Sequence, residues 1–305
     1  MIAKRNVVKI FRKIQLLLAT QVRSKENSEE LMSELNKKYD IKEKLGYGAF
    51  GVVFSAVRKD DDEHVAIKVT KKKSVYSWKK DNLKKIPSEI DTMLKCKKIP
   101  GVVQLEEWYF LSDYYIIIMS KPTQCMDLGE MIEKYDKLNE NLARFLFQQI
   151  VITVKYCMKN DVVHKDIKME NIVIDMETGK TILIDFGAAT SRNIKTKEIQ
   201  GTVGYVPPEW FLYEMYLDEP ATVWSLGILL YGMLKGTLPF STEYEICTQR
   251  IEKMAQMQDL TSEAQHLIEN CLEFDFSSRF SFEEILKSNW MKESTLSWNQ
   301  LISNS

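Results

Sequence analysis

Hydrophobic and polar positions divide the chain into two parts. From about Tyr39, β-branched and aromatic residues recur in short runs between glycines and charged turns, as in "YDIKEKLGYGAFGVVFSAV", "RKDDDE" and "HVAIKVT". This pattern predicts a glycine-interrupted hairpin followed by a third strand. A helix is expected around residues 86–97, and two further strands are expected at "VVQLEEWYF" and "YYIIIMS".

After Pro122 the apolar positions recur mainly at helical spacing. Helices are predicted over 127–135, 140–159, 222–235, 243–257, 261–272 and 281–287. The longest apolar run, "WSLGILLYGML" at 224–234, is too short to span a membrane and is expected to form a buried helix. Strands followed by helices predict an α+β protein of two lobes. The first, β-rich lobe covers 39–119, the mostly helical second covers 120–293, and a tail covers 294–305.

The N-terminal extension, residues 1–38, differs in composition. Residues 1–25 carry seven Lys or Arg and no acid. On a helical wheel the apolar side chains share one face and the basic ones lie opposite. Such a basic amphipathic helix would suit binding to a membrane surface or to a partner. The pattern also resembles a mitochondrial presequence. We favour the alternative, a poorly ordered extension or a helix that rests on the main domain.

Composition and charge narrow the class of protein only a little. The 305 residues are 45% hydrophobic and 28% charged with a net charge of −1, as in soluble globular proteins, and no overall charge points to nucleic acid. The five cysteines form no CxxC pair and no metal-ligand spacing. Reduced thiols and a cytoplasmic location are therefore expected, with a nuclear location left open, and a monomer is expected.

The glycines of "LGYGAFGVVF" suggest a phosphate site. Gly46, Gly48 and Gly51 form G-x-G-x-x-G, which alone is weak because glycines also mark turns. A strand rather than a helix follows them, so a strand–turn–strand is expected, with backbone N–H groups free to approach phosphates. Lys68 in "VAIK" and Glu89 on the next helix suit a lysine that grips phosphates and an acid that orients it.

A second constellation lies in the helical part. The stretch "VVHKDIKMEN" places Asp166, Lys168 and Asn171 together, and "IDFG" supplies Asp185. Asp166 would accept the proton of a hydroxyl, and Lys168 would neutralise charge on a phosphoryl group. Asn171 and Asp185 would hold Mg²⁺. Each of these residues taken alone could be an ordinary turn or loop residue. Their joint order and spacing are not explained in that way.

These motifs, followed by "PPE" at 207–209, resemble those of a eukaryotic protein kinase across residues 39–292. The resemblance implies ATP and Mg²⁺ between the lobes and transfer of phosphate to a protein hydroxyl. Lys168 and "GTVGY" resemble the serine/threonine class, in which Thr202 contacts Asp166 and Lys168. The resemblance also assigns an activation segment, with Asp185, Phe186, Gly187, Thr202, Pro208 and Glu209.

Within the kinases, "PPEW", "FEEI", "NWM" and the linker "MSKPTQCMDL" are most similar to the PIM family. Pro122 has no backbone N–H to offer to adenine. ATP would rely on the Ser120 carbonyl, with Met119 as gatekeeper. The remaining expected ATP contacts are Leu45, Val53, Ala66, Val173 and Ile184.

The resemblance also raises questions of regulation and specificity. Lys165 stands where most kinases have an arginine that pairs with a phosphorylated activation loop, and lysine lacks the guanidinium fork. Kinases of the PIM type are active without loop phosphorylation, so we expect a working catalytic loop. A pseudokinase that binds nucleotide as a scaffold is the alternative. Protein substrates with basic residues before the acceptor are expected, bound by the acids Asp127, Glu130, Glu170 and Glu243. Arg279 is expected to tie to Glu209, and His164 to pack beneath Phe186.

Overall fold

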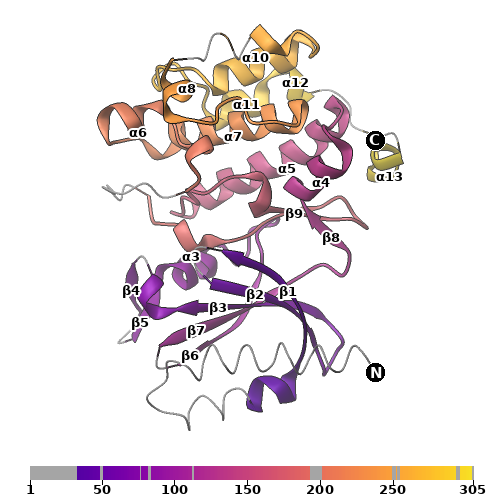
Figure 1. Cartoon of the computed structure of the whole chain (residues 1–305), viewed down its shortest axis with the longest axis vertical. Helices are drawn as coiled ribbons and strands as arrows, with labels where there is room; N and C mark the ends of the chain where they lie inside the picture. Colours follow the sequence, from indigo (N-terminus) through magenta and orange to yellow (C-terminus); the bar gives the residue numbers. More distant parts are fainter. Residues whose placement is uncertain are drawn as a thin grey trace. The chain divides into compact units, whose positions relative to one another are not determined.

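The computed structural model describes residues 33–48, 51–75, 77–81, 84–111, 113–192, 201–248, 252, 255–292 and 296–303. The predicted amphipathic segment lies outside these residues. The chain divides into two units (Figure 1). Unit 1 takes in Met1–Lys97 and Val103–Thr123, and unit 2 takes in Lys98–Val102 and Gln124–Ser305.

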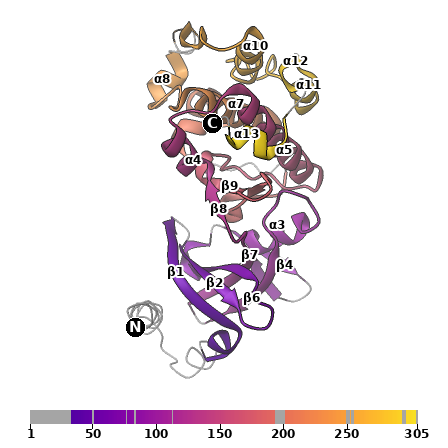
Figure 2. The ribbon, with the colours of Figure 1, turned by 90° about the vertical axis from the view of Figure 1, so that its right-hand side faces the viewer.

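Unit 1 is built on a five-stranded antiparallel sheet, seen in Figure 2, with the strand order β1-β2-β3-β7-β6. Its strands are β1 (Tyr39–Gly48), β2 (Gly51–Arg58), β3 (His64–Lys71), β6 (Leu105–Phe110) and β7 (Tyr114–Ser120). The predicted hairpin, third strand and two later strands are therefore confirmed. All of β7 except its last residue is buried, which explains why its sequence is a continuous apolar run.

The two faces of this sheet carry different side chains, because neighbouring residues of a strand point to opposite faces. Phe54, Ile67, Ile116 and Ile118 belong to the buried core on one face. The residues between them, such as Lys68, point to the other face. Strand alternation alone thus separates the core from the face that carries the candidate site.

The helix α3 (Ser88–Cys96) packs against strands of unit 1 and confirms the helix expected near 86–97. A short hairpin, β4 (Trp78–Asp81) paired with β5 (Lys84–Pro87), precedes it and was not predicted. Its sequence, "WKKDNLKKIP", is dominated by lysine, which has a low strand preference, so pattern alone did not reveal it.

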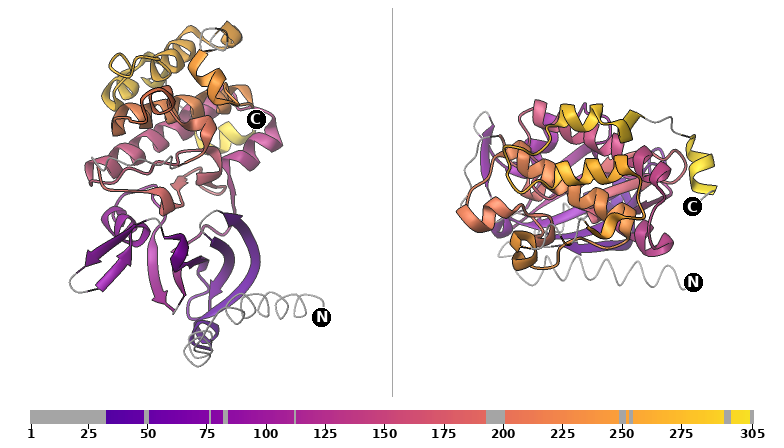
Figure 3. Two further views of the ribbon diagram at one scale, coloured as in Figure 1. Left: turned by 60° about the vertical axis from the view of Figure 1, so that its left-hand side comes forward. Right: turned by 90° about the horizontal axis from the view of Figure 1, so that it is seen from above.

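Unit 2 is mostly helical, and its helices are shown from two sides in Figure 3. They are α4 (Leu128–Tyr135), α5 (Glu140–Lys159), α6 (Pro208–Tyr213), α7 (Asp218–Lys235), α8 (Glu243–Thr248), α10 (Ser262–Cys271), α11 (Phe282–Lys287), α12 (Asn289–Lys292) and α13 (Trp298–Ser303). Unit 2 also contains a small three-stranded sheet, in which β9 (Ile172–Asp175) lies between β10 (Thr181–Leu183) and β8 (Cys125–Asp127). No helix in the described residues is long and apolar enough to cross a bilayer.

Most predicted helices of unit 2 are present, with two differences. The helix predicted from 222 begins earlier, at Asp218, because polar residues of its first turn carry no apolar periodicity. The prediction of one helix over 243–257 is wrong, since α8 ends at Thr248 and residues Ala255–Met257 form a 3-10 turn.

The tail predicted after residue 293 contains a helix, α13, that packs against α5. Trp298 stacks on Phe145 with ring centroids 6.1 Å apart and donates a hydrogen bond from Nε1 to the Met176 carbonyl at 2.9 Å. Gly179 has a φ of 70°, and a Cβ there would come within 2.5 Å of the indole. The turn that joins β9 to β10 is therefore shaped to receive this tryptophan.

Candidate active site

The candidate site residues of unit 1 centre on a buried ion pair. Lys68 and Glu89 are 4% and 3% exposed, and Lys68 Nζ contacts Glu89 Oε1. Tyr115 donates a hydrogen bond from its hydroxyl to Glu89 Oε2 at 2.7 Å. Glu89 lies in the first turn of α3, where the helix dipole favours a carboxylate. The expected contact is confirmed, and it holds the lysine in one place on β3.

The strand register places residues of unit 1 that are expected to contact ATP on one face of the sheet. Val53 lies opposite Lys68 in β2–β3, and Ala66 lies opposite Met119 in β3–β7. Opposed residues of antiparallel strands project from the same face, and so do residues two apart in one strand. Val53, Ala66, Lys68 and Met119 therefore share the face opposite the core. Their contact with adenine stays a prediction.

The glycine-rich loop joins β1 to β2, with Gly48 opposite Gly51, and Leu45 on β1 is exposed. A Cβ on Gly51 would lie 2.3 Å from the Val69 carbonyl oxygen, so packing requires glycine there. Among the described residues, no atom lies within 4 Å of a Cβ placed on Gly46. Packing therefore does not explain Gly46, whereas close approach of a phosphate would.

In unit 2 the carboxylate of Asp166 is the centre of a hydrogen-bonded network. Asn171 Nδ2 donates to Asp166 Oδ2 at 2.9 Å and to its carbonyl at 2.8 Å. Thr202 Oγ1 donates to Asp166 Oδ1 at 3.1 Å and accepts from Lys168 Nζ at 2.9 Å. The Lys168 ammonium lies 3.3 Å from Asp166 Oδ2. The predicted contacts of Thr202 are thus confirmed, and Asp166 is oriented by three side chains.

Asn171 and Asp185 are brought together by the β9–β10 hairpin. The N–H of Ile184 donates to the Asn171 carbonyl at 3.0 Å, directly beyond the last strand pair. Asn171 uses its amide N–H groups on Asp166, so its amide oxygen is the atom suited to a metal. An amide oxygen beside a carboxylate is a donor set that suits Mg²⁺, which takes one or two protein oxygens plus phosphates. Both residues fit the ion expected there.

The histidine of the loop has a structural position. His164 Nε2 lies 2.9 Å from the Ile184 carbonyl, and its ring packs edge-on against Phe186 at 4.9 Å, as expected. The Asp166 N–H donates to His164 Nδ1 at 3.4 Å. Burial lowers the pKa of this histidine, although the neighbouring Asp166 charge opposes the effect. The neutral imidazole therefore braces the backbone on either side of the site.

The activation segment is described at its two ends, Asp185–Arg192 and Gly201 onward. Asp185 has a φ of 59° and accepts from the Gly187 N–H at 3.2 Å. Pro208 begins α6 and is followed by Glu209, which pairs with Arg279 through two hydrogen bonds of 3.0 Å. This buried pair confirms the expected tie and fixes α6 to the rest of unit 2.

The four candidate substrate acids do not form one group. Asp127 and Glu130 form a capping box at the start of α4. The Glu130 N–H donates to Asp127 Oδ1 at 2.9 Å, and the Asp127 N–H donates to Glu130 Oε2 at 3.0 Å, so both side chains stabilise the helix. Burial raises the pKa of Asp127, and the charges of Glu130 and Glu170 add to this, so these three acids are neighbours. Glu243 lies apart on α8 (Figure 1). Their role in substrate binding stays a prediction.

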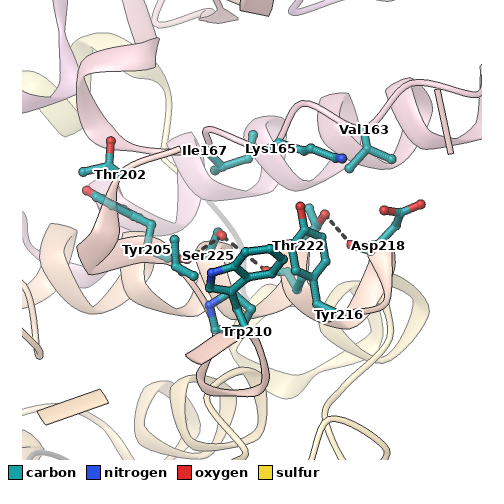
Figure 4. A pocket seen from close by; sticks show the side chains of 13 residues that line it. Val163, Lys165, Ile167, Thr202, Tyr205, Trp210, Tyr216, Asp218, Thr222 and Ser225 are labelled. Carbon is teal, nitrogen blue, oxygen red and sulfur yellow. Dashed lines mark hydrogen bonds between the residues drawn. The ribbon is translucent and has the colours of Figure 1, made fainter. Parts of the chain in front are cut away.

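Two sets of contacts were not identified from sequence, namely that of Tyr115 with Glu89 and those of the aromatic residues near Lys165. Tyr115 reaches Glu89 only because β7 lies beside β3, a pairing that no local motif encodes. Lys165 lines a pocket of unit 2, shown in Figure 4, together with aromatic residues that follow Thr202 in the chain. Within the described residues, no group of three or more His, Cys, Asp or Glu could hold a metal.

Comparison with known proteins agrees with this geometry. The protein kinase domain family matches residues 39–291. The chain is 45% identical over 274 residues to serine/threonine-protein kinase prk-2 of Caenorhabditis elegans, covering 89% of this chain and 62% of that protein. It is 35% identical over 271 residues to serine/threonine-protein kinase pim-2 of Danio rerio, covering 85% and 86%. It is 30% identical over 301 residues to serine/threonine-protein kinase dkf-1 of C. elegans, covering 94% and 41%.

The chain therefore belongs to the protein kinase family, and its domain is that of an ATP-dependent protein serine/threonine kinase. The expected α+β kinase fold, with one lobe built on a β-sheet and one mostly helical, is confirmed. The chain spans less than two thirds of the length of prk-2 and most of the length of pim-2.

Proposed function

We propose that this protein is an active kinase that transfers the γ-phosphate of Mg·ATP to serine or threonine hydroxyls of proteins. The observation that carries this proposal is the network around Asp166, in which a carboxylate is oriented by Asn171 and Thr202 beside the Lys168 ammonium. Phosphoryl transfer depends mainly on positioning and charge compensation, which such a network supplies.

Each side chain then has a separate task. Asp166 orients the acceptor hydroxyl and takes its proton, while Lys168 compensates charge on the transferring group. Lys68, held by Glu89, contacts the phosphates of ATP. Asn171 and Asp185 would hold Mg²⁺, which neutralises phosphate charge when it is bound.

The finer properties belong to the same proposal. The protein is of the PIM type, supported by its likeness to pim-2 and by Pro122, whose missing N–H limits contacts to adenine. It prefers basic residues before the acceptor, supported by the neighbouring acids Asp127, Glu130 and Glu170. It needs no phosphate on its activation loop. It acts as a monomer in the cytoplasm or the nucleus.

The test is transfer from labelled Mg·ATP to a degenerate serine/threonine peptide library by phosphatase-treated protein. Transfer to basic peptides, absent in Asp166→Asn, is the expected result. Transfer without basic preference would remove the substrate proposal and keep the enzyme. A folded protein that binds nucleotide and transfers nothing would contradict the proposal and favour a scaffold.

A further inference from the structure

The Lys165 side chain enters a pocket formed by the chain between Thr202 and Ser225. The pocket wall includes Tyr205, Tyr216 and Asp218. Figure 4 shows Lys165 extending across one side of this pocket, with Tyr216 and Asp218 facing it from the other. Lys165 is the only Lys or Arg among the described residues that line it.

The amine of Lys165 is held by charge rather than by hydrogen bonds. Its Nζ is buried and has no hydrogen-bond acceptor among the described residues. It lies 5.8 Å from the centroid of the Tyr216 ring, within the range of a cation–π interaction. Burial lowers the pKa of Lys165, and the Asp218 carboxylate partly opposes this. A desolvated ammonium is costly, so the ring and Asp218 supply the compensation that keeps it charged.

The pocket wall is itself fixed in place. Trp210 packs edge-on against Tyr216 with ring centroids 5.6 Å apart. Trp210 lies on α6, next to Glu209, whose pair with Arg279 anchors that helix. Thr222 Oγ1 donates to the Asp218 carbonyl at 2.7 Å within α7. Lys165 is therefore attached to a rigid surface, not to a loose loop.

The backbone of Lys165 directly adjoins the catalytic carboxylate. Its φ is 66°, a left-handed conformation that is strained for a lysine and that sets the direction of Asp166. A Cβ on Gly201 would lie 2.5 Å from the Lys165 carbonyl oxygen, so the chain before Thr202 closes on this residue. Holding the Lys165 side chain thus holds the backbone from which Asp166 projects.

We propose that Lys165 is a positioning residue, which holds Asp166 in its catalytic conformation through the Tyr216 ring and the Asp218 carboxylate. This inference rests on the proposed kinase activity and gives a physical basis for its independence from loop phosphorylation. The positive charge beside Asp166 is already compensated inside unit 2, so no phosphate from residues 193–200 is required.

Kinetics of phosphatase-treated variants test this inference. Lys165→Met keeps the apolar stem and removes the charge, and Tyr216→Leu removes the ring. Each is expected to lower kcat by about tenfold, the effect of a cation–π contact of roughly 1.4 kcal/mol, with an unchanged KM for ATP. The double variant loses no more than either single one, because both remove the same contact.

Conservative variants and one control complete the experiment. Lys165→Arg and Tyr216→Phe keep the cation and the ring, and recover most of kcat. Tyr213→Leu changes a tyrosine that is 63% exposed on the same stretch and leaves kcat unchanged. Wild-type kcat falls at high pH as the Lys165 ammonium deprotonates near Tyr205, Tyr216 and Asp218, and Lys165→Arg moves this fall to higher pH.

The outcomes separate the inference from the proposed function. Inactive wild-type protein after phosphatase treatment would contradict the proposed function itself. Active wild type whose kcat is unchanged in Tyr216→Leu would overturn the positioning role alone. The melting temperature shows whether Lys165→Met folds. If it does not fold, Tyr216→Leu is compared with Tyr216→Phe instead. Equal kcat values in these two variants would overturn the inference.

Discussion

Asp166 shows how neighbouring side chains orient one carboxylate. Its two oxygens accept hydrogen bonds from Asn171 and Thr202, and it is only 8% exposed. A surface aspartate would rotate among conformers, whereas this one is aimed at a single place. The spacing of the motifs predicted which residues belong to the candidate site, and the structure shows which hydrogen bonds connect them.

Asp166→Asn is expected to keep this shape and lose the base. The amide is nearly isosteric with the carboxylate, so the melting temperature and nucleotide binding should stay close to wild type. The value of kcat should fall by roughly 10²–10⁴, the usual contribution of a general base. Single-turnover phosphate transfer measures this. Glu133→Gln, an exposed acid on α4, is the matched control, and comparable rates in Asp166→Asn and wild type would exclude Asp166 as the base.

Lys68→Met is expected to destabilise the protein as well as inactivate it. The substitution leaves the Glu89 carboxylate buried without its cation, which costs about 3–5 kcal/mol. Thermal melting should show a large decrease. Adding Glu89→Gln removes the unpaired charge and should recover much of the melting temperature without recovering activity. A double variant no more stable than Lys68→Met would show that the pair is not the source of the loss.

At the scale of elements, predictions from sequence succeeded where one face of a helix or strand is buried. The helix α5 was predicted with its present bounds, because its apolar residues recur at helical spacing. The hairpin β4–β5 and the short strands β8, β9 and β10 were missed. Three or four residues carry too little periodicity, and their pairing depends on segments far away in sequence.

The helix α13 provides an element-scale prediction. Trp298→Ala removes the indole from its place against Phe145 and Gly179, and should lower the free energy of unfolding by roughly 3–5 kcal/mol. Hydrogen exchange should increase at the β9–β10 turn, where Trp298 bonds to Met176. Ser303→Ala, at the exposed end of the same helix, is the control. Unchanged exchange at the turn would mean that the tail does not hold it.

At the scale of the whole molecule, the five cysteines differ in how far they are buried. Cys96, Cys157 and Cys271 are buried, whereas Cys125 and Cys247 are partly exposed. Burial raises the pKa of Cys271 to about 12, so its thiol is almost wholly protonated at neutral pH. The native protein should therefore react quickly with a thiol reagent at no more than two of its five cysteines.

Thiol titration with and without denaturant checks this count. All five cysteines should react in denaturant, because none of them forms a disulfide in the structure. Cys125→Ser and Cys247→Ser should each remove one fast-reacting thiol. Rapid reaction of a third cysteine in the native protein would show that one of the buried positions opens.

The sequence alone determined the class of fold, the order of the motifs and the roles proposed for Asp166, Lys168, Asn171 and Asp185. These follow from local periodicity and from the functional groups of side chains at fixed spacing. The tertiary structure decided which residues far apart in sequence support them. Tyr115 on Glu89, Arg279 on Glu209 and Tyr216 on Lys165 are examples. Such contacts depend on strand pairing and helix packing, which bring distant segments together and which no local pattern encodes.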